Sequence, residues 1–329
     1  MLHKIIAVTI EDCLNILLPK WLKAMKEASI IAGDLVLEKY YGTIKPLQDK
    51  DYSESVDELK NALKSAVTEA DYEVQKVLLI RFIELGLHEL MGVLSEEDNE
   101  QIAALEKKFL HRGELPAKRL TLVIDSIDGT GCLINTNSEN HVLKRGNPAN
   151  KDNFGISIGL AYGKKIIAGV VYMPARDILM STSILGETRI NNKIVRIDKN
   201  QRFSTSDPVK LSSTLKKSQL IPDFKALDKL LSNTKNTDST VANMLAFLKG
   251  EMKIYISEGI DFTDFNMWGL MLRNAGGFMG NLEGNPITEE DLLLKTDKGW
   301  FLKGFFMLSP SREYQQKLIK VLLENNLLK

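Results

Sequence analysis

Apolar residues between positions 19 and 41 recur at spacings of three and four, which is the period of a helix with one buried face. They are Trp21, Leu22, Met25, Ala28, Ile31, Ala32 and Leu35. Proline is well suited to a first helical turn, so the pattern predicts a helix from Pro19 to about Tyr41. The polar segment from Gly42 to Glu58 is typical of a loop, and Thr68 is placed to cap a second helix.

The middle of the chain has the pattern of β-structure. Leu120–Ile124 is a short apolar run that ends in acids. Two β-rich runs, Phe154–Tyr162 and Lys165–Tyr172, are separated by Gly163-Lys164, which predicts a hairpin. Further strands are expected at Ile178–Thr182 and Ile194–Ile197, with a turn at Asn191-Asn192. The polar stretch from Leu133 to Asp152 indicates an exposed insertion.

The second half alternates between strands and helices, and the pattern resets near Arg202–Asp207. We therefore expect two lobes, residues 1–203 and 204–329. Helices and mixed strands in layers indicate an α+β fold. The expected strands are Val209–Ser213, Lys253–Ser257 and Phe278–Leu282; the expected helices are Thr240–Leu248, Asp264–Ala275, ended by Gly276-Gly277, and Tyr314–Leu328.

Charge and cysteine content narrow the class of protein. The 43 Lys and Arg residues balance the 43 Asp and Glu residues, which argues against binding to a nucleic acid polymer or a membrane surface. The 2 cysteines do not form a disulfide framework. The apolar run Ile5–Ile10 is too short for a signal peptide, and no apolar run is long enough to span a bilayer. We expect a cytoplasmic protein.

The segment Leu122–Thr130 carries the first chemical signal. An apolar strand delivers Asp125 and Asp128, with the Ile127 carbonyl between them, and then breaks at Gly129. Hard cations such as magnesium prefer oxygen ligands of this kind, and the following amides could bind phosphate. A surface turn rich in Asp and Gly is the alternative, because such turns are abundant.

Two more acidic groups accompany this segment. Glu96, Glu97 and Asp98 follow the apolar pair Val93-Leu94, and Asp264 stands at the head of an amphipathic helix. Each group alone is better explained as a solvated helix start or an N-cap. Three acidic groups in one register favour a shared metal site.

Together these segments resemble the inositol monophosphatase family, a group of lithium-sensitive, magnesium-dependent phosphatases. Leu122–Thr130 is similar to the family signature W-V-I-D-P-I-D-G-T, with Leu122 and Ser126 as departures. The family elements G-E-E, V-T-x-x-D and W-D-x-A-A-G…E-A-G-G are matched by Ser95-Glu96-Glu97, by Val67–Asp71, and by Thr263-Asp264 with Ala275-Gly276-Gly277. The resemblance implies a layered αβαβα sandwich of the inositol monophosphatase and fructose-1,6-bisphosphatase type.

The resemblance also implies roles for single residues. Glu96, Asp125 and the Ile127 carbonyl would ligate one magnesium ion, and Asp125, Asp128 and Asp264 a second, with a third ion held weakly near Glu96. Asp71 and Thr130 would orient the attacking water. The amides of Gly129 and Thr130 would bind the phosphate, and Ser239 and Ser257 stand at positions of substrate contact.

The substrate implied by the resemblance stays open. Ser257 replaces a glutamate that contacts inositol in the family, and Asp238-Ser239 alters a small-residue turn. Ser65–Thr68 resembles the 3′(2′),5′-bisphosphate nucleotidase branch, whereas the length suits inositol polyphosphate 1-phosphatases. Lys144-Arg145 in the insertion is placed to reach a second phosphate, although a solvated loop explains it as well. The expected partner is a small phosphorylated substrate, in a possible homodimer, and the alternative function is that of an inactive relative that binds phosphate ligands or acts as a scaffold.

Overall fold

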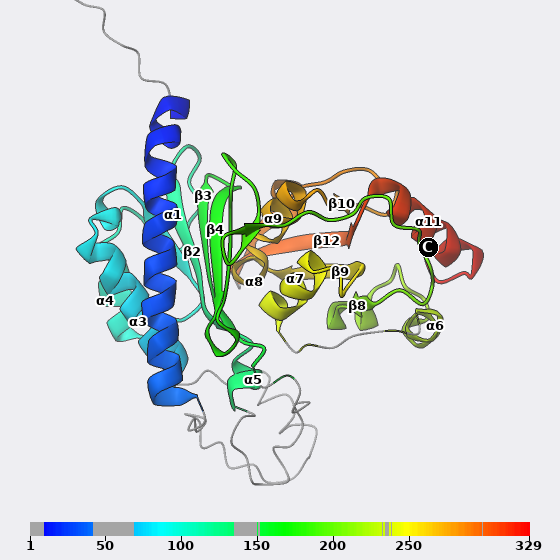
Figure 1. Cartoon of the computed structure of the whole chain (residues 1–329), viewed down its shortest axis with the longest axis horizontal. Helices are drawn as coiled ribbons and strands as arrows, with labels where there is room; N and C mark the ends of the chain where they lie inside the picture. Colours follow the sequence, from blue (N-terminus) through cyan, green and yellow to red (C-terminus); the bar gives the residue numbers. More distant parts are fainter. Residues whose placement is uncertain are drawn as a thin grey trace, which may run out of the picture.

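The computed structural model describes residues 10–41, 69–134, 150, 152–231, 233, 237, 239–297 and 299–329 (Figure 1). Four features predicted from the sequence lie outside these residues. They are the polar segment after Tyr41, the cap at Thr68, Asp238, and the body of the insertion with Lys144-Arg145.

The first helix, α1, runs from Ile10 to Leu35 and continues as a π-helical turn, Val36–Tyr40. The predicted start at Pro19 is wrong, because Pro19 lies inside α1. Proline removes one helical hydrogen bond, yet the preceding Leu18 is only 1% exposed and belongs to the same core as Trp21. Packing against the sheet therefore holds the turn before the proline in the helix.

The first sheet contains seven strands in sequence order. β1 pairs parallel with β2, and the other neighbours pair antiparallel. The strands are β1 (Gly92–Ser95), β2 (Leu120–Asp128), β3 (Gly155–Tyr162), β4 (Lys165–Met173), β5 (Ile178–Ser183), β6 (Arg189–Ile190) and β7 (Lys193–Ile194). The predicted hairpin is confirmed as β3 and β4, and Asn191 and Asn192 form the β6–β7 turn with positive φ.

The second sheet has the order β10-β12-β9-β8, with β11 beside β12. β8 and β9 are parallel, and the other pairs are antiparallel. The strands are β8 (Val209–Leu211), β9 (Ile254–Asp261), β10 (Phe278–Gly280), β11 (Leu293–Thr296) and β12 (Gly299–Ser309).

Three apolar cores join the sheets and helices into five layers (Figure 1). One core packs α1 and α3 (Glu69–Glu84) on the first sheet, and the next packs α7 (Thr240–Leu248), α8 (Phe262–Phe265) and α9 (Trp268–Ala275) between the sheets. The third packs α6 (Phe224–Leu230) and α11 (Arg312–Glu324) outside the second sheet. The αβαβα arrangement is confirmed, whereas the division at residue 203 stays a proposal. The remaining helical segments are η2 (Leu87–Glu89), α4 (Glu100–Glu106), α5 (Thr130–Ile134), η4 (Pro174–Arg176), η5 (Ser213–Lys217) and α10 (Glu289–Leu292).

Strand β12 was not predicted from the sequence. It lies between β10 and β9 in the second sheet, and Phe305–Leu308 are all buried. A strand covered on both faces has a continuous apolar run and lacks the alternation that marks a half-exposed strand.

The helix predicted at Asp264–Ala275 is two helices, α8 and α9. The buried side chain of Asn266 separates them. Its amide donates to the Thr263 carbonyl at 2.9 Å and to the Val123 carbonyl at 3.4 Å. Side-chain bonds of this kind compete with the helical ladder, so the chain turns here and α9 begins in a new direction. Gly276, with φ 95°, ends α9 as predicted.

Phe265 anchors α8 in the core between the sheets. It is fully buried, and its ring stacks on Trp268 at 5.3 Å. We expect Phe265→Ala to lower the free energy of unfolding by about 3–5 kcal/mol, because it leaves a cavity among aromatic rings. Urea denaturation measures this. Leu294→Ala, at a residue that is 45% exposed, should change stability by less than about 0.5 kcal/mol. Equal losses in the two variants would contradict the assignment of Phe265 as an anchor.

Candidate functional site

A bulge in β2 directs the two aspartates of the central motif. Asp125 is paired with Ser157 and Asp128 with Gly155, so β2 contains one more residue than β3 between these pairs. Side chains alternate along a regular strand, which would place residues three apart on opposite faces. The extra residue interrupts this alternation once, so Asp128 comes to lie on the same face of the sheet as Asp125.

Glu96 reaches the same point from the neighbouring strand. β1 runs parallel to β2, so the carboxyl ends of both strands meet at one edge of the sheet. The Glu96 amide donates to the Ile124 carbonyl at 3.1 Å and fixes the backbone of Glu96 next to Asp125.

Asp264 completes a group of three carboxylates. One oxygen each of Glu96, Asp125 and Asp264 lies within 4.8 Å of the others. Asp264 is in the first turn of α8, whose N-cap is Asp261, so Asp264 itself is not the cap. Residues from both halves of the chain thus converge on one point.

Mutual repulsion and loss of hydration disfavour the charged forms of these groups. Burial raises the pKa of Asp125 well above its ordinary value, and the charges of Glu96, Asp128 and Asp264 add to this. The pKa of Asp264 is raised in the same way by burial and by Asp128 and Glu96. Glu96 is exposed as a residue, but desolvation of its carboxyl in the crowded site raises the pKa to about 7 against a hydrogen bond with Asp125.

The oxygen atoms of this group fit a divalent cation. Asp125 is fully buried, and apart from the Glu96 carboxyl no group in the part of the chain that the structure describes donates a hydrogen bond to its carboxylate oxygens. The Glu96 carboxyl beside it can only share a proton. A buried carboxylate normally has a donor or a cation as its partner, and carboxylate oxygens are the ligands that magnesium prefers.

Asp128 lies outside this group of three and faces the start of α7. Its carboxylate accepts hydrogen bonds from the Ser239 hydroxyl, from the Thr240 amide at 3.1 Å and from the Val241 amide at 2.8 Å. Helix N-termini favour negative charge, so Asp128 links β2 to the beginning of α7. Its predicted role as a metal ligand stays a prediction.

Thr130 and Asp71 are in contact, as the sequence motif implied. The Thr130 hydroxyl lies 2.9 Å from Asp71 Oδ1 and 2.9 Å from the Ile127 carbonyl oxygen, and it can donate its single proton to one of them at a time. Asp71 is buried in the first turn of α3. This pair places an oriented hydroxyl beside Gly129, at the end of β2.

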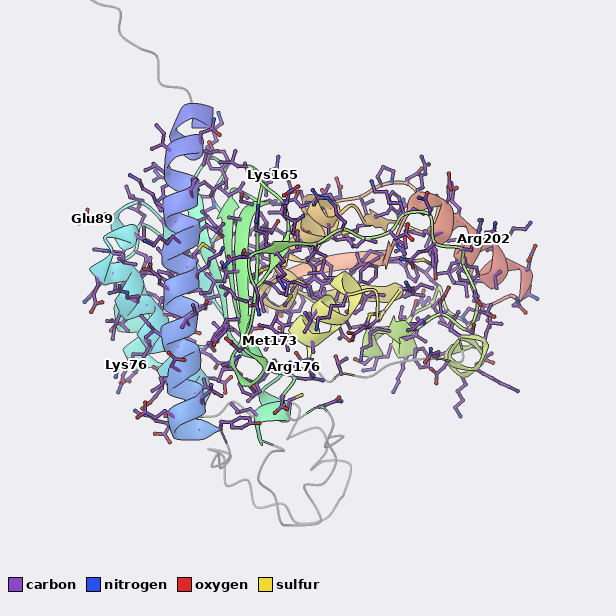
Figure 2. The ribbon with its side chains drawn as sticks, viewed as in Figure 1. Lys76, Glu89, Lys165, Met173, Arg176 and Arg202 are labelled. Carbon is purple, nitrogen blue, oxygen red and sulfur yellow. The ribbon has the colours of Figure 1, made fainter. Side chains whose placement is uncertain are left out.

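Gly129 is required by its surroundings. Its φ is 83°, and a Cβ atom there would lie 2.6 Å from the Asn153 carbonyl oxygen and 2.8 Å from Ser239 Cβ. Ser239 itself caps α7. Figure 2 shows Met173 and Arg176 at the end of β4, and Arg176 donates to the side chain of Asn153. The loop is therefore held closely on two sides.

Ser257 is fully buried in β9, and its hydroxyl donates to the Gly259 carbonyl at 3.2 Å. Contact between this side chain and a substrate stays a prediction.

Asp261 is a neighbour of the site that sequence reasoning missed. Its charge raises the pKa of both Glu96 and Asp264. Its carboxylate caps α8 by accepting from the Thr263 amide at 3.0 Å. In the sequence, only its position three residues before Asp264 indicated that it would lie near the site.

The sequence model of the inositol monophosphatase family matches residues 18–323. The chain belongs to the inositol monophosphatase family. Members of this family are metal-dependent phosphomonoesterases, and the group of Glu96, Asp125 and Asp264 can hold such a metal. None of the curated protein sequences compared with the chain matches it significantly.

Solved structures of family members share the fold. The extragenic suppressor protein SuhB from Bartonella henselae is 16% identical, with a TM-score of 0.61 over 92% of this chain and 97% of that one. The inositol monophosphatase from Anabaena (Nostoc) sp. PCC 7120 is 19% identical, with a TM-score of 0.60 over 93% and 96%. Inositol monophosphatase-II from Staphylococcus aureus is 15% identical, with a TM-score of 0.59 over 91% and 94%. Within the described residues, every helix is too short or too polar to cross a membrane.

The raised pKa values in this family member predict how its stability depends on pH. Burial, with the charges of Asp71 and Glu96, raises the pKa of Glu97 from 4.5 to about 8. A carboxyl whose pKa is higher in the folded state stabilises the fold at low pH, and this contribution is lost as the pH rises through the folded value. Without metal, the melting temperature should therefore fall between pH 5 and pH 8.5.

Thermal melts in EDTA and in magnesium measure this. Magnesium should raise the melting temperature more at pH 8.5 than at pH 5, because its ligands must be ionised. Glu97→Gln should weaken the fall in EDTA. If the melting temperature in EDTA rose with pH, ionisation of these carboxyl groups would not destabilise the fold, and the prediction would be wrong.

Proposed function

We propose that this chain is a magnesium-dependent phosphomonoesterase that hydrolyses a small phosphorylated metabolite. The supporting observation is the buried Asp125 carboxylate, which within the described residues has only other carboxyl groups as polar neighbours and lies within reach of Glu96 and Asp264. A site of this kind is costly to maintain unless a divalent cation neutralises it.

The proposed ligands fall into two overlapping sets. Glu96, Asp125 and the Ile127 carbonyl would hold one magnesium ion, and Asp128 and Asp264 would join Asp125 around a second. When bound, such ions neutralise phosphate oxygens and lower the pKa of a coordinated water. A third ion would be held near Glu96.

The attacking water is assigned to Asp71 and Thr130. Their contact of 2.9 Å supports a relay in which the Thr130 hydroxyl donates to Asp71 and accepts a hydrogen bond from the water. The lone pair of the water that attacks phosphorus is then directed toward the substrate. No side chain is phosphorylated in this scheme.

The phosphate would be bound by the backbone amides of Gly129 and Thr130. The cramped surroundings of Gly129 support this, because only a glycine lets the loop approach Ser239 and Asn153 so closely. Ser239 lies at the same junction, and its hydroxyl donates to the proposed ligand Asp128, whereas the Ser257 hydroxyl is fully buried and donates to the Gly259 carbonyl.

The substrate class is supported by structures that share the fold. SaIMPase-II, about one-sixth identical to this chain, has been solved with inositol monophosphate and with 2′AMP bound. Both a sugar-like alcohol phosphate and a nucleotide are therefore sensible candidates. A kcat/KM panel of inositol 1-phosphate, inositol 1,4-bisphosphate, fructose 1,6-bisphosphate and adenosine 3′,5′-bisphosphate tests this, with and without magnesium. Binding of these compounds without any hydrolysis would favour an inactive, ligand-binding relative.

Asp264→Asn tests the metal assignment. We expect kcat/KM on the best substrate of the panel to fall at least about 100-fold, because loss of even an outer partner of a metal ligand costs about 10–100-fold. The melting temperature in EDTA should not fall, since the substitution removes repulsion and keeps the side-chain volume. Asp228→Asn on the exposed side of α6 is the control and should retain activity within about twofold. Near-normal turnover by Asp264→Asn would contradict the assignment.

A further inference from the structure

Gln75 is a fully buried polar residue, and the hydrogen bonds of its side-chain amide all go to the turn that contains Ser95, Glu96 and Glu97. Its Nε2 donates to the Glu97 carbonyl at 2.7 Å and to the Ser95 hydroxyl at 2.8 Å, and its Oε1 accepts from the Glu97 amide at 3.0 Å. Lys76, the next residue, marks this part of α3 in Figure 2. The side chain thus binds the residues on both sides of Glu96.

The Ser95 hydroxyl extends this contact into a longer network. It donates to the buried carboxylate of Glu106 in α4, and Arg112 pairs with Glu106 and, at 2.7 Å, with Asp98. Serine stands here at the position of the glycine in the family's G-E-E element, and a glycine has no hydroxyl to offer. The network is therefore specific to this version of the motif.

These bonds fix the backbone on both sides of Glu96. Its own amide is bound to the Ile124 carbonyl, Ser95 is bound by its side chain, and both polar backbone groups of Glu97 are bound by Gln75. The backbone of the turn cannot shift without breaking a buried hydrogen bond, and an unpaired buried group costs about 1–3 kcal/mol. The Glu96 carboxylate is held close to Asp125 as a result.

Helix α3 joins this turn to the proposed water site. Asp71 lies four residues before Gln75, on the same face of α3. Asp71 contacts Thr130, and Gln75 contacts the turn that carries Glu96. One rigid helix face therefore spans the two parts of the site.

We propose that Gln75 is a positioning residue that sets the metal affinity of the site by fixing the Ser95-Glu96-Glu97 turn. The proposal rests on the proposed function, because it assumes that Glu96 ligates a metal. Partners that orient metal ligands change metal affinity about 10–100-fold when they are removed. A purely structural glutamine would change stability alone.

The chain offers a matched control in Gln315. It is also fully buried in a helix, α11, and its Nε2 donates to the Asn281 carbonyl at 2.8 Å. It belongs to none of the groups at the site. Met is similar in length to Gln and makes no such hydrogen bond. Gln75→Met removes three buried hydrogen bonds, and Gln315→Met removes the bond to Asn281 from an equally buried helical glutamine.

The test is a titration of the purified full chain with Mn²⁺, in which electron paramagnetic resonance measures the free ion. Gln75→Met should raise the Kd for Mn²⁺ about 10–100-fold. Gln315→Met should lower the melting temperature in EDTA by less than Gln75→Met, because it removes fewer hydrogen bonds, and should leave the Kd within about twofold. A Kd within twofold for a folded Gln75→Met protein, or an equal rise in Gln315→Met, would overturn the proposal.

Ser95→Gly is the milder second variant, and it decides the matter if Gln75→Met does not fold. It removes one of the three Gln75 contacts and should raise the Kd by roughly threefold to tenfold; an unchanged Kd would overturn the network. Failure of the unaltered chain to bind Mn²⁺ would instead overturn the proposed function, and the inference with it.

Discussion

The repulsion among buried carboxylates is the constraint on which the site depends. Asp125 is inaccessible to water, and Glu96 and Asp264 lie within 4.8 Å of it. Burial and mutual repulsion raise the pKa values of these carboxyl groups, so their charged forms are unfavourable in the folded chain. A doubly charged cation bound among them would remove this cost most effectively. Buried, mutually repelling carboxyl groups lower the stability of the fold, and groups with strongly shifted pKa values are common at functional sites.

The five-layer architecture holds these carboxyl groups in place despite their mutual repulsion. Asp125 and Glu96 come from adjacent parallel strands, and Asp264 comes from a short helix anchored by Phe265 between the two sheets. Asp128 reaches across to the N-terminus of α7. Because the carboxylates stand on separate elements that are each packed into an apolar core, the fold holds them together against their mutual repulsion.

The features that depend on neighbouring residues in the sequence could be predicted, whereas those that depend on tertiary contacts could not. Asp125 and Asp128 were predictable because their strand, spacing and glycine are contiguous, and α7 was predicted with its observed bounds. Strand β12 was missed since a strand buried on both faces shows no alternation, and the α8–α9 break depends on the distant Val123 carbonyl. The effect of Asp261 on Glu96 and the contacts of Gln75 with the turn that carries Glu96 arise only through tertiary structure, and no local pattern distinguishes Ser257 as a buried residue.

The most direct test of this account is an anomalous diffraction map of crystals of the chain soaked in Mn²⁺. The account predicts a strong peak among Glu96, Asp125 and Asp264, within bonding distance of at least one oxygen of Asp125. An empty site at saturating Mn²⁺ would contradict it.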